Sequence, residues 1–455
     1  MTQQQFEGLK QLRLLLEENP AGLTDFLRDQ HPADLAEWLE ELTDDQRVLV
    51  FNHLSAESAA LVMGELDIDT QAGIVGDLGR ERAGDIIEEM DPDDAADLLA
   101  ELTPEEQGQL LGELQAEDAA EVRELLEHEP DTAGGIMTTD YITVQEHMTA
   151  QAAIDHLRRV GPEAETLYYV YVVDAGEHLV GVISLRDLIV AAPDTAVRDI
   201  MRTKVVSVRA DQDQEEVARA VSKYDLLAIP VVDAENRLVG MVTVDDVLDV
   251  IEEEATEDAL RMSAVTPGEE DPSGTGFGAG IWRLARPRLP WLVALLFLEL
   301  ASGKVIDHFQ AAFNPATLAL LTIFITTMAG EAGNAATQAL AVVVRSLATG
   351  EIAPGDVARV VWRELRVGLT VGLVAGVVLA GLALVWQANV HLALTVGLAI
   401  AVNIVVAKML GAFFPIVITR FGFDPAVASG PLITSITDVT SMLTYFGVAS
   451  LLLRI

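Results

Sequence analysis

Leucine recurs at a fixed interval in the first part of the chain. Residues 42, 54, 66, 78, 90, 102, 114 and 126 are leucine, except that residue 90 is methionine. Thr43 with Gln46, and Thr103 with Glu106, form two predicted capping boxes directly after such positions. One short helix and its turn cannot bury an apolar face alone, so the repeat predicts stacked helices. We expect an α-helical superhelix over residues 1–130.

A longer pattern occurs twice, 59 residues apart. VVDAGEHLVGVISLRDLIV (172–190) recurs as VVDAENRLVGMVTVDDVLDV (231–250), and IMTTDYITV upstream is echoed by IMRTKVVSV. Each copy predicts a strand, a helix, a strand, a glycine-containing turn, a strand and a helix. The pattern resembles a pair of CBS domains, which pack as one pseudo-symmetric regulatory unit. We assign the copies to residues 131–199 and 200–252.

The last part of the chain is apolar. Val367–Ala407 contains 41 residues without Asp, Glu, Lys or Arg, and one bilayer crossing takes about 20. This stretch therefore predicts two spans, with Gln387–Asn389 as the turn. Glycines at 368, 372 and 376 are spaced to let helices approach closely. Three more stretches bring the total to five spans in a membrane domain over residues 284–455: near Leu289–Gly303, Ala316–Val344 and Ala426–Leu453.

Basic residues set the predicted orientation. Arg283, Arg286 and Arg288 precede the first span, and further basic residues flank the later connections on the same side. An excess of Lys and Arg marks cytoplasmic segments. The N-terminus shows no basic region followed by an apolar core, so we expect no signal peptide. We predict a multi-pass protein of the cell (inner) membrane, with its N-terminus in the cytoplasm and its C-terminus outside.

The net charge of −42 arises in the first part of the chain. Before Gly276 there are 63 acidic and 18 basic side chains, and from Gly276 onward there are 8 and 11. This balance excludes nucleic acid as a partner, which needs a basic surface. It fits cations, or simply a solvated acidic surface. The absence of cysteine excludes disulfides, thiolate metal sites and cysteine nucleophiles.

Three acidic residues fall inside the predicted spans, where an ionisable group is costly and therefore a functional candidate. We expect Glu299 near the membrane surface, with a structural role. Glu331 lies in a polar interruption of a span, which is tolerated only against protein or water. Asp438 is surrounded in sequence by Ser and Thr hydroxyls, a setting that suits a hydrated hard cation. The alternative for Asp438 is a buried hydrogen bond between helices.

The helix predicted from Asp245 leads toward the membrane domain. Asp246, Asp249, Glu253 and Glu257 share one of its faces. A close pair of like charges costs about 4 kcal/mol at an effective dielectric constant of about 20, which a bridging divalent cation relieves. A solvated acidic face is the alternative. We assign residues 253–283 to an acidic linker helix and loop.

This order of segments resembles the MgtE family of Mg²⁺ channels. The most specific matches include YYVYVVD (168–174), EATED (254–258) and ITDVTSMLTY (436–445). The resemblance implies a homodimer formed through the CBS and transmembrane domains, with a pore on the two-fold axis. It implies a pore cation site at Asp438 with Asn334 and Gln338, to which we add Glu331. The chain departs from the family pattern at Ala335, Ala336, Thr337 and Gly430.

The resemblance also implies regulatory Mg²⁺ sites on cytoplasmic acids, although Leu61 stands where another acid is expected. For the CBS pair it implies a nucleotide, ATP, at Tyr169, Arg186 and Asp187. The implied regulatory metal ligands are Asp93, Asp97, Glu215, Asp225, Asp246, Asp249, Glu254, Glu257, Asp258 and Asp424.

The expected fold is multidomain α and α/β: an α-superhelix, a CBS pair, a linker helix and five membrane helices. The expected function is an Mg²⁺ channel for uptake, closed when intracellular Mg²⁺ binds the acidic domains. Alternatives are a coupled secondary transporter, a channel preferring Mn²⁺ or Co²⁺, and an anchored adenylate-binding module. We expect no enzyme, because the chain contains no P-loop, HExxH or GxSxG motif.

Overall fold

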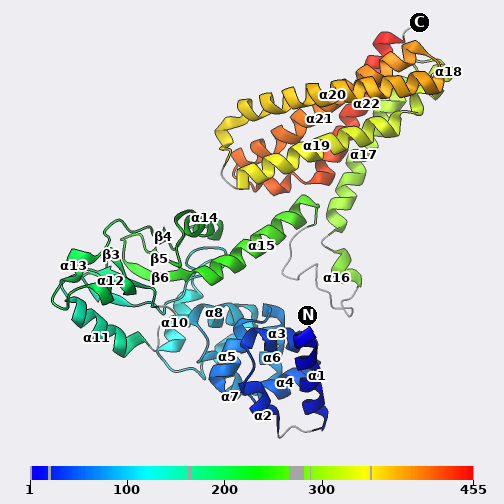
Figure 1. Ribbon diagram of the computed structural model, residues 1–455. Coiled ribbons are helices and arrows are strands. Elements are labelled where there is room, and N and C mark those ends of the chain that lie inside the picture. Colours follow the sequence, from blue (N-terminus) through cyan, green and yellow to red (C-terminus); the bar gives the residue numbers. More distant parts are fainter. Residues whose placement is uncertain are drawn as a thin grey trace. The chain divides into compact units, whose positions relative to one another are not determined.

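The computed structural model describes residues 3–18, 22–161, 167–265, 281–286, 288–348 and 351–453. The chain divides into two compact units, residues 1–252 and 253–455. Figure 1 shows the elements of each. The predicted fold class is confirmed, and the loop expected between the linker and the membrane domain lies largely outside the described residues.

The first unit begins with short helices whose starts follow the leucine repeat. The helices from α4 to α9 begin at residues 44, 56, 68, 80, 92 and 104. Both predicted capping boxes are present, at Thr43 and at Thr103. Helices two apart in sequence pack together, as α4 does on α6 and α5 on α7. The bounds are α1 Gln3–Glu18, α2 Leu23–Arg28, α3 Pro32–Glu40, α4 Asp44–Phe51, α5 Ala56–Gly64, α6 Ile68–Asp77, α7 Arg80–Ile87, α8 Pro92–Glu101, α9 Pro104–Leu110 and α10 Asp118–Leu125.

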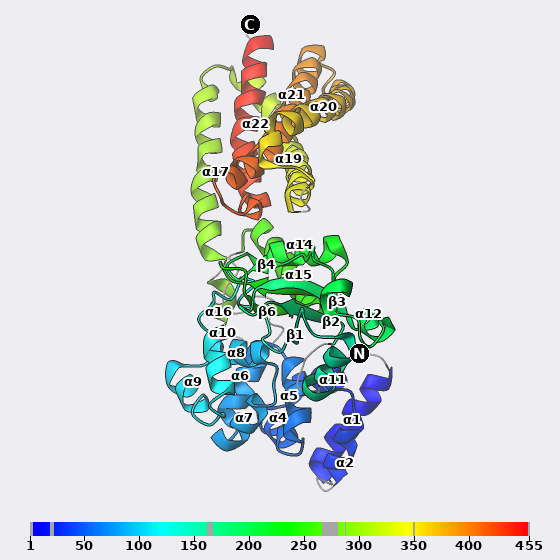
Figure 2. The ribbon, with the colours of Figure 1, turned by 90° about the vertical axis from the view of Figure 1, so that its left-hand side faces the viewer.

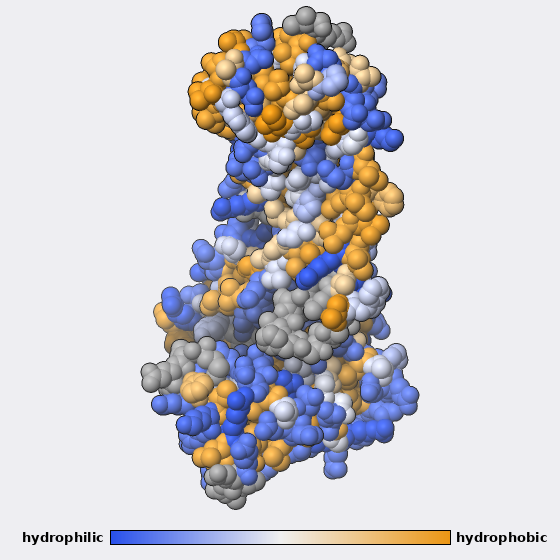
Figure 3. Space-filling model, turned by 90° about the vertical axis from the view of Figure 1, so that its right-hand side faces the viewer, coloured by the Kyte–Doolittle hydropathy of each residue, from blue (hydrophilic) through white to orange (hydrophobic). Residues whose placement is uncertain are grey.

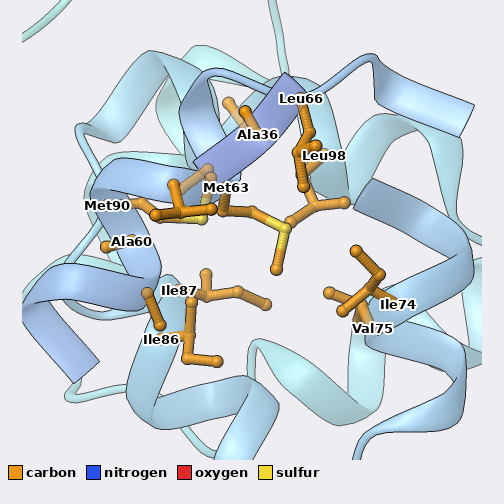
Figure 4. Packing of buried hydrophobic residues seen from close by; sticks show 14 of the residues in the cluster. Ala36, Ala60, Met63, Leu66, Ile74, Val75, Ile86, Ile87, Met90 and Leu98 are labelled. Atoms are coloured by element: carbon orange, nitrogen blue, oxygen red, sulfur yellow. The ribbon is translucent and has the colours of Figure 1, made fainter. Parts of the chain in front are cut away.

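The repeat residues point into the core of this superhelix. Leu66 and Met90 are buried, and Figure 4 shows them with Met63, Ile87 and Leu98 in one packed cluster. Because each helix contributes only a few apolar side chains, the core exists only where several repeats stack. The sequence pattern therefore predicted this part of the fold correctly.

Two three-stranded sheets follow, with the same topology. In each, the first strand pairs parallel to the second, which pairs antiparallel to the third. The pairs Val172↔Gly181 and Val231↔Gly240 occupy equivalent positions, each beside the same irregularity. The duplication is thus structural as well as sequential. The elements are β1 Thr143–Gln145, α11 Ala150–Val160, β2 Tyr169–Val173, β3 Leu179–Ser184, α12 Leu185–Val190, α13 Val197–Ile200, β4 Val208–Arg209, α14 Gln214–Tyr224, β5 Ala228–Val232, β6 Leu238–Thr243 and α15 Val244–Met262.

The tight turns in the two sheets differ from the prediction. The left-handed residues are Glu177, with φ of 65°, and Asn236, with φ of 67°. These are equivalent positions, and neither is glycine. The expectation of a glycine-containing turn in each copy is wrong for the second, where asparagine adopts the left-handed conformation at low cost.

Helix α15 is continuous across residue 252. The sequence placed a domain boundary there, between the second CBS copy and the linker. The last helix of the second copy and the linker helix are therefore one element.

The second unit contains five helices or helix pairs that are long and apolar enough to cross a membrane, within the described residues. Chain reversal occurs at Ala388, with φ of 50°, and Asn389 caps the next helix, as predicted. Figure 3 shows hydrophobic residues over much of this unit's surface. The bounds are α16 Ile281–Ala285, α17 Leu289–Gln310, α18 Pro315–Thr322, α19 Ile325–Ala348, α20 Val357–Gln387, α21 Val390–Arg420 and α22 Gly430–Leu452, with 3₁₀ turns at Pro354–Asp356 and Pro425–Val427.

Helices α20 and α21 pack through the predicted glycines. A Cβ atom on Gly372 would lie 2.6 Å from the Ala401 carbonyl oxygen, and one on Gly376 would lie 2.6 Å from that of Gly397. Such distances leave no room for a side chain. The glycine spacing therefore fixes how closely these two helices approach.

The first membrane helix is longer than predicted. Helix α17 continues to Gln310 rather than ending near Gly303. Glu299 consequently lies near the middle of α17 and not near the end of the apolar stretch, where the sequence placed it.

Candidate metal and pore sites

In the first unit, acidic side chains of α8 and α15 converge on Asp94. Burial, and then the neighbouring carboxylates of Asp91, Asp246, Asp97 and Asp249, raise the pKa of Asp94 to about 7. Burial also raises the pKa of Asp246, although hydrogen bonds from Thr243 oppose this shift. The site is therefore strongly repulsive when every carboxylate is ionised.

The sequence identified this region but missed its central residue. The predicted ligands were Asp93 and Asp97, and the sequence did not single out Asp94 between them, which interacts with Asp246 and Asp249 of α15. The side chain of Asp93 is only 8% exposed.

The predicted ligands Glu215 and Asp225 lie at opposite ends of α14. Glu215 accepts a hydrogen bond from Arg219 at 2.5 Å, and Asp225 ends the helix in the left-handed conformation, with φ of 52°. Ten residues of helix separate them by about 15 Å, so one ion cannot contact both. Within one chain, the two residues therefore cannot be ligands of the same ion.

The end of the linker helix carries a contact that the sequence did not predict. Arg261 forms ion pairs with Glu257, one turn earlier, and with Asp424, before α22. Both carboxylates were predicted as metal ligands. The structure brings them together through a guanidinium, and Met262 beside it packs against the apolar core of the second unit. The linker acids Glu254 and Asp258 lie on the same helix.

Asp438 lies near the middle of α22 and is half-buried. Its nearby hydroxyls bond to their own helix: Thr437 donates to the Thr434 carbonyl, and Thr440 to that of Thr437. Their oxygen lone pairs remain available as acceptors. The predicted oxygen-rich surroundings are thus present. No residue that the structure describes forms an ion pair with Asp438.

The other predicted pore residues share one face of α19. Glu331, Asn334 and Gln338 are all exposed in the single chain. Behind them, Gly411 of α21 comes so close to the Ala336 carbonyl oxygen that no Cβ atom would fit. Tight packing of α21 against the opposite side of α19 therefore fixes the orientation of the polar face that carries Glu331, Asn334 and Gln338.

Two departures from the family pattern lie opposite each other. A Cβ atom on Gly430 would meet Thr337 at 3.8 Å and the Met262 carbonyl oxygen at 3.5 Å. Thr337 itself donates a hydrogen bond to Gly333 within α19. The contact between α19 and the start of α22 thus accommodates both substitutions.

Among the described residues, Glu299 of α17 is a carboxylate that interacts electrostatically with Asp438. Helices α17 and α22 run side by side in the same direction (Figure 2). The rings of Phe309 and Phe446 stack with centroids 5.8 Å apart. Because the two helices run in the same direction, a residue of α22 lies at the same height along the helix axes as the α17 residue whose number is 137 lower. Asp438 therefore lies level with residue 301. Sequence reasoning named Glu299 but gave it a structural role and did not pair it with Asp438, because it ended the span near Gly303.

The three predicted nucleotide residues line one cleft. Tyr169, Arg186 and Asp187 border a cleft of about 810 Å³ in the CBS pair, together with Arg202 and Lys204. Ser184 donates a hydrogen bond to the Asp187 carboxylate at 2.8 Å. An aromatic wall, basic side chains and a fixed carboxylate provide stacking, charge and hydrogen bonding for a nucleotide.

No group of three or more His, Asp or Glu side chains converges closely enough to enclose a metal ion within the described part of the chain. The acidic side chains around Asp94 therefore offer carboxylates to an ion without a closed cage of protein ligands. Such an arrangement suits Mg²⁺, which keeps several waters and contacts one or two carboxylates.

Comparisons with known proteins assign a family to most of the chain. A family model described as "Divalent cation transporter" (MgtE) matches residues 325–448, and the MgtE intracellular N domain matches residues 30–131. The CBS domain matches residues 133–194 and 197–253. All three predicted segments therefore have family counterparts in the predicted order.

Individual relatives agree. Magnesium transporter MgtE of Enterococcus faecalis is 43% identical over 338 residues, which cover 74% of this chain and 72% of that protein. MgtE of Thermus thermophilus is 43% identical over 335 residues, covering 74% and 73%. The crystal structure of the cytosolic domain of the Mg²⁺ channel MgtE in complex with ATP is 46% identical, with a TM-score of 0.51, covering 52% of this chain and 97% of that one. These are transporters rather than enzymes, which confirms the expectation that this chain is no enzyme.

Proposed function

This chain belongs to the MgtE family of divalent cation transporters, and on that premise we propose that it is an Mg²⁺ channel of the cell membrane. The observation that carries the proposal is Asp438, a half-buried carboxylate in the middle of α22 among acceptor oxygens. A charge at that depth is retained only where it is paired or hydrated. Hydrated Mg²⁺ supplies both a counter-charge and water.

Flux and single-channel recording test this function. Wild-type protein in liposomes takes up Mg²⁺, and Asp438→Ala, inserted at equal level, does not. Under ion gradients, a channel reverses at the Mg²⁺ equilibrium potential whatever the Na⁺ or H⁺ gradient. Normal flux through Asp438→Ala contradicts the assignment of the pore, and exchange of Mg²⁺ for Mn²⁺ in the same recording measures selectivity.

A coupled transporter is the second candidate, and one observation favours it. A site for a coupling ion normally adds further carboxylates within the membrane, and Glu299 interacts electrostatically with Asp438. A reversal potential that follows the Na⁺ or H⁺ gradient would replace the channel by this candidate.

We further propose that intracellular Mg²⁺ closes the pore by neutralising the cytoplasmic acids. The repulsion around Asp94 and along α15 opposes close packing of these helices. The closed state must bind Mg²⁺ more tightly than the open state for a shift to follow. Combined Asp246→Asn, Glu254→Gln and Glu257→Gln should leave conduction intact and raise the Mg²⁺ concentration needed for closure. Closure at the wild-type concentration contradicts the gate.

A homodimer is proposed from the polar face of α19. Glu331, Asn334 and Gln338 are exposed in the single chain, and such side chains do not face lipid. A second copy across a water-filled axis would cover them. Because the chain contains no cysteine, Asn334→Cys should form a disulfide-linked dimer on oxidation, whereas Leu382→Cys, on an apolar exposed face, should not. The reverse result would contradict this interface.

Orientation and nucleotide binding complete the proposal. The N-terminus lies in the cytoplasm and the C-terminus outside, which the reaction of single introduced cysteines with an impermeant reagent tests. The cleft at Tyr169 and Lys204 binds ATP, as the related cytosolic domain does.

A further inference from the structure

Glu299 and Asp438 are two carboxylates in the membrane with no evident counter-charge. Neither forms an ion pair or a side-chain hydrogen bond with another residue in the described ranges, and the two interact electrostatically. Neighbouring carboxylates that repel each other inside a bilayer are stable only if a cation or protons neutralise them. Glu299 is exposed in the single chain.

Ser302 supplies a second, independent observation. Its side chain is only 7% exposed, and its Oγ has no hydrogen-bond partner in the part of the chain that the structure describes. Ser302 belongs to the stripe of α17 that packs on α22, with Val305 and Phe309. A buried hydroxyl without a partner is costly and calls for an explanation.

The three side chains lie at one level of the membrane. The stacking of Phe309 on Phe446 places Asp438 level with residue 301 of α17, between Glu299 and Ser302. Successive helical residues rise about 1.5 Å, so all three lie within about 5 Å along the helix axes. Every donor atom is oxygen, the set that hard cations prefer over nitrogen or sulfur.

We propose that Glu299, Asp438 and Ser302 form one cation site at the α17–α22 contact, in which Glu299 is a second carboxylate ligand of the transported divalent cation. This inference rests on the proposed Mg²⁺ transport, and it adds a ligand from the first membrane helix. Two carboxylates balance the charge of one Mg²⁺ ion, and retained waters complete its coordination.

Carbodiimide labelling tests the site without measuring transport. Dicyclohexylcarbodiimide modifies carboxyl groups in apolar surroundings, and mass spectrometry of the full-length protein reads each position. Mg²⁺ should protect Glu299 and Asp438 over the same concentration range. In Asp438→Asn, protection of Glu299 should require about tenfold more Mg²⁺, because one of two anionic ligands is lost. The proposed site is overturned if the extent of labelling at Glu299 does not change with Mg²⁺, or if it changes with Na⁺ alone.

Uptake by liposomes gives the second measurement. Glu299→Gln should raise the half-saturating Mg²⁺ concentration about tenfold. Ser302→Ala should raise this concentration less. Glu299→Asp, which keeps the carboxylate, should also raise it less than Glu299→Gln does. The matched control is Asp307→Asn, an exposed acid on the same helix about 12 Å away, which should behave as wild type. Adding Glu299→Gln to Asp438→Asn should cause a loss that differs from the sum of the two single losses, and losses that simply add overturn the shared site.

The two experiments separate the failure of this site from the failure of the proposed function. Wild-type protein that takes up no Mg²⁺ refutes the transport function, while protection from labelling still decides the site. Wild-type uptake with an unaltered Glu299→Gln variant refutes the site alone.

Discussion

Arg261 of α15 donates a hydrogen bond from Nη1 to Oδ2 of Asp424 at 2.5 Å, across 163 residues of sequence. The Arg261 side chain is 32% exposed and that of Asp424 is 27% exposed, so water screens this pair less than it screens a surface pair. Glu257 forms a second ion pair with the same guanidinium. The end of the linker helix is thereby attached to the segment that precedes helix α22, which carries Asp438.

The first prediction concerns this attachment. Arg261→Gln should leave conduction intact and raise the Mg²⁺ concentration for closure several-fold, because a partly buried ion pair contributes about 1 kcal/mol. Patch recording against cytoplasmic Mg²⁺ measures the shift. Asp424→Asn should add little in the double variant, since both substitutions remove one interaction. Arg209→Gln, which loses only an exposed ion pair with Asp211, is the control, and an equal shift there contradicts the prediction.

The second prediction concerns Asp94 and pH. Its folded pKa of about 7 lies above the unfolded value near 4. Protonation therefore stabilises the fold most below about pH 4, and this contribution is lost as the pH rises toward 7. Without Mg²⁺, amide hydrogen exchange in α8 should be slower at pH 6 than at pH 8, after correction for the intrinsic exchange rate.

Replacing Asp94, or adding Mg²⁺, tests whether the Asp94 carboxyl group causes this pH dependence. Asp94→Asn should remove this pH dependence and slow exchange at pH 8, by on the order of a few kcal/mol in local opening free energy. Mg²⁺ should protect α8 more at pH 8 than at pH 6, because it replaces the proton. Asp77→Asn, at an exposed acid in the same superhelix, should change neither. Retained pH dependence in Asp94→Asn would contradict the assignment.

The third prediction concerns helix packing behind the polar face. Gly411→Ala should destabilise the membrane domain by about 1–3 kcal/mol, because its Cβ atom collides with the Ala336 backbone. Thermal unfolding of purified protein measures the loss. Gly381→Ala is the matched control, since nothing lies within 4 Å of its Cβ position. Equal melting temperatures for the two variants would contradict the role of close approach.

The fourth prediction concerns the cleft in the CBS pair. Lys204→Ala should weaken ATP binding about tenfold, because a charge-assisted contact to phosphate is lost. Calorimetric titration measures this affinity. Arg198→Ala removes an exposed basic residue outside the cleft and should bind ATP as wild type. Equal affinity of both variants would place the nucleotide elsewhere.

Features determined by neighbours in sequence were predicted well. The capping box at Thr103 begins α9 as expected, since an N-cap needs only residues within one turn. The span boundary at Ala388 followed from a local loss of hydrophobicity. The end of α17 was placed wrongly, because Lys304 and Asp307 interrupt its apolar run while the helix itself continues.

The sequence by itself determined the kinds of element and their order: a helical repeat, a duplicated strand–helix unit and five apolar spans. These follow from periodicity, capping and the length of apolar runs, all of which act over a few residues. Only the tertiary structure decided which carboxylates meet. Glu299 approaches Asp438 across 139 positions because the stacking of Phe309 on Phe446 sets the register of two helices. Asp94 meets the acids of α15 because helix rotation depends on packing by every neighbour at once.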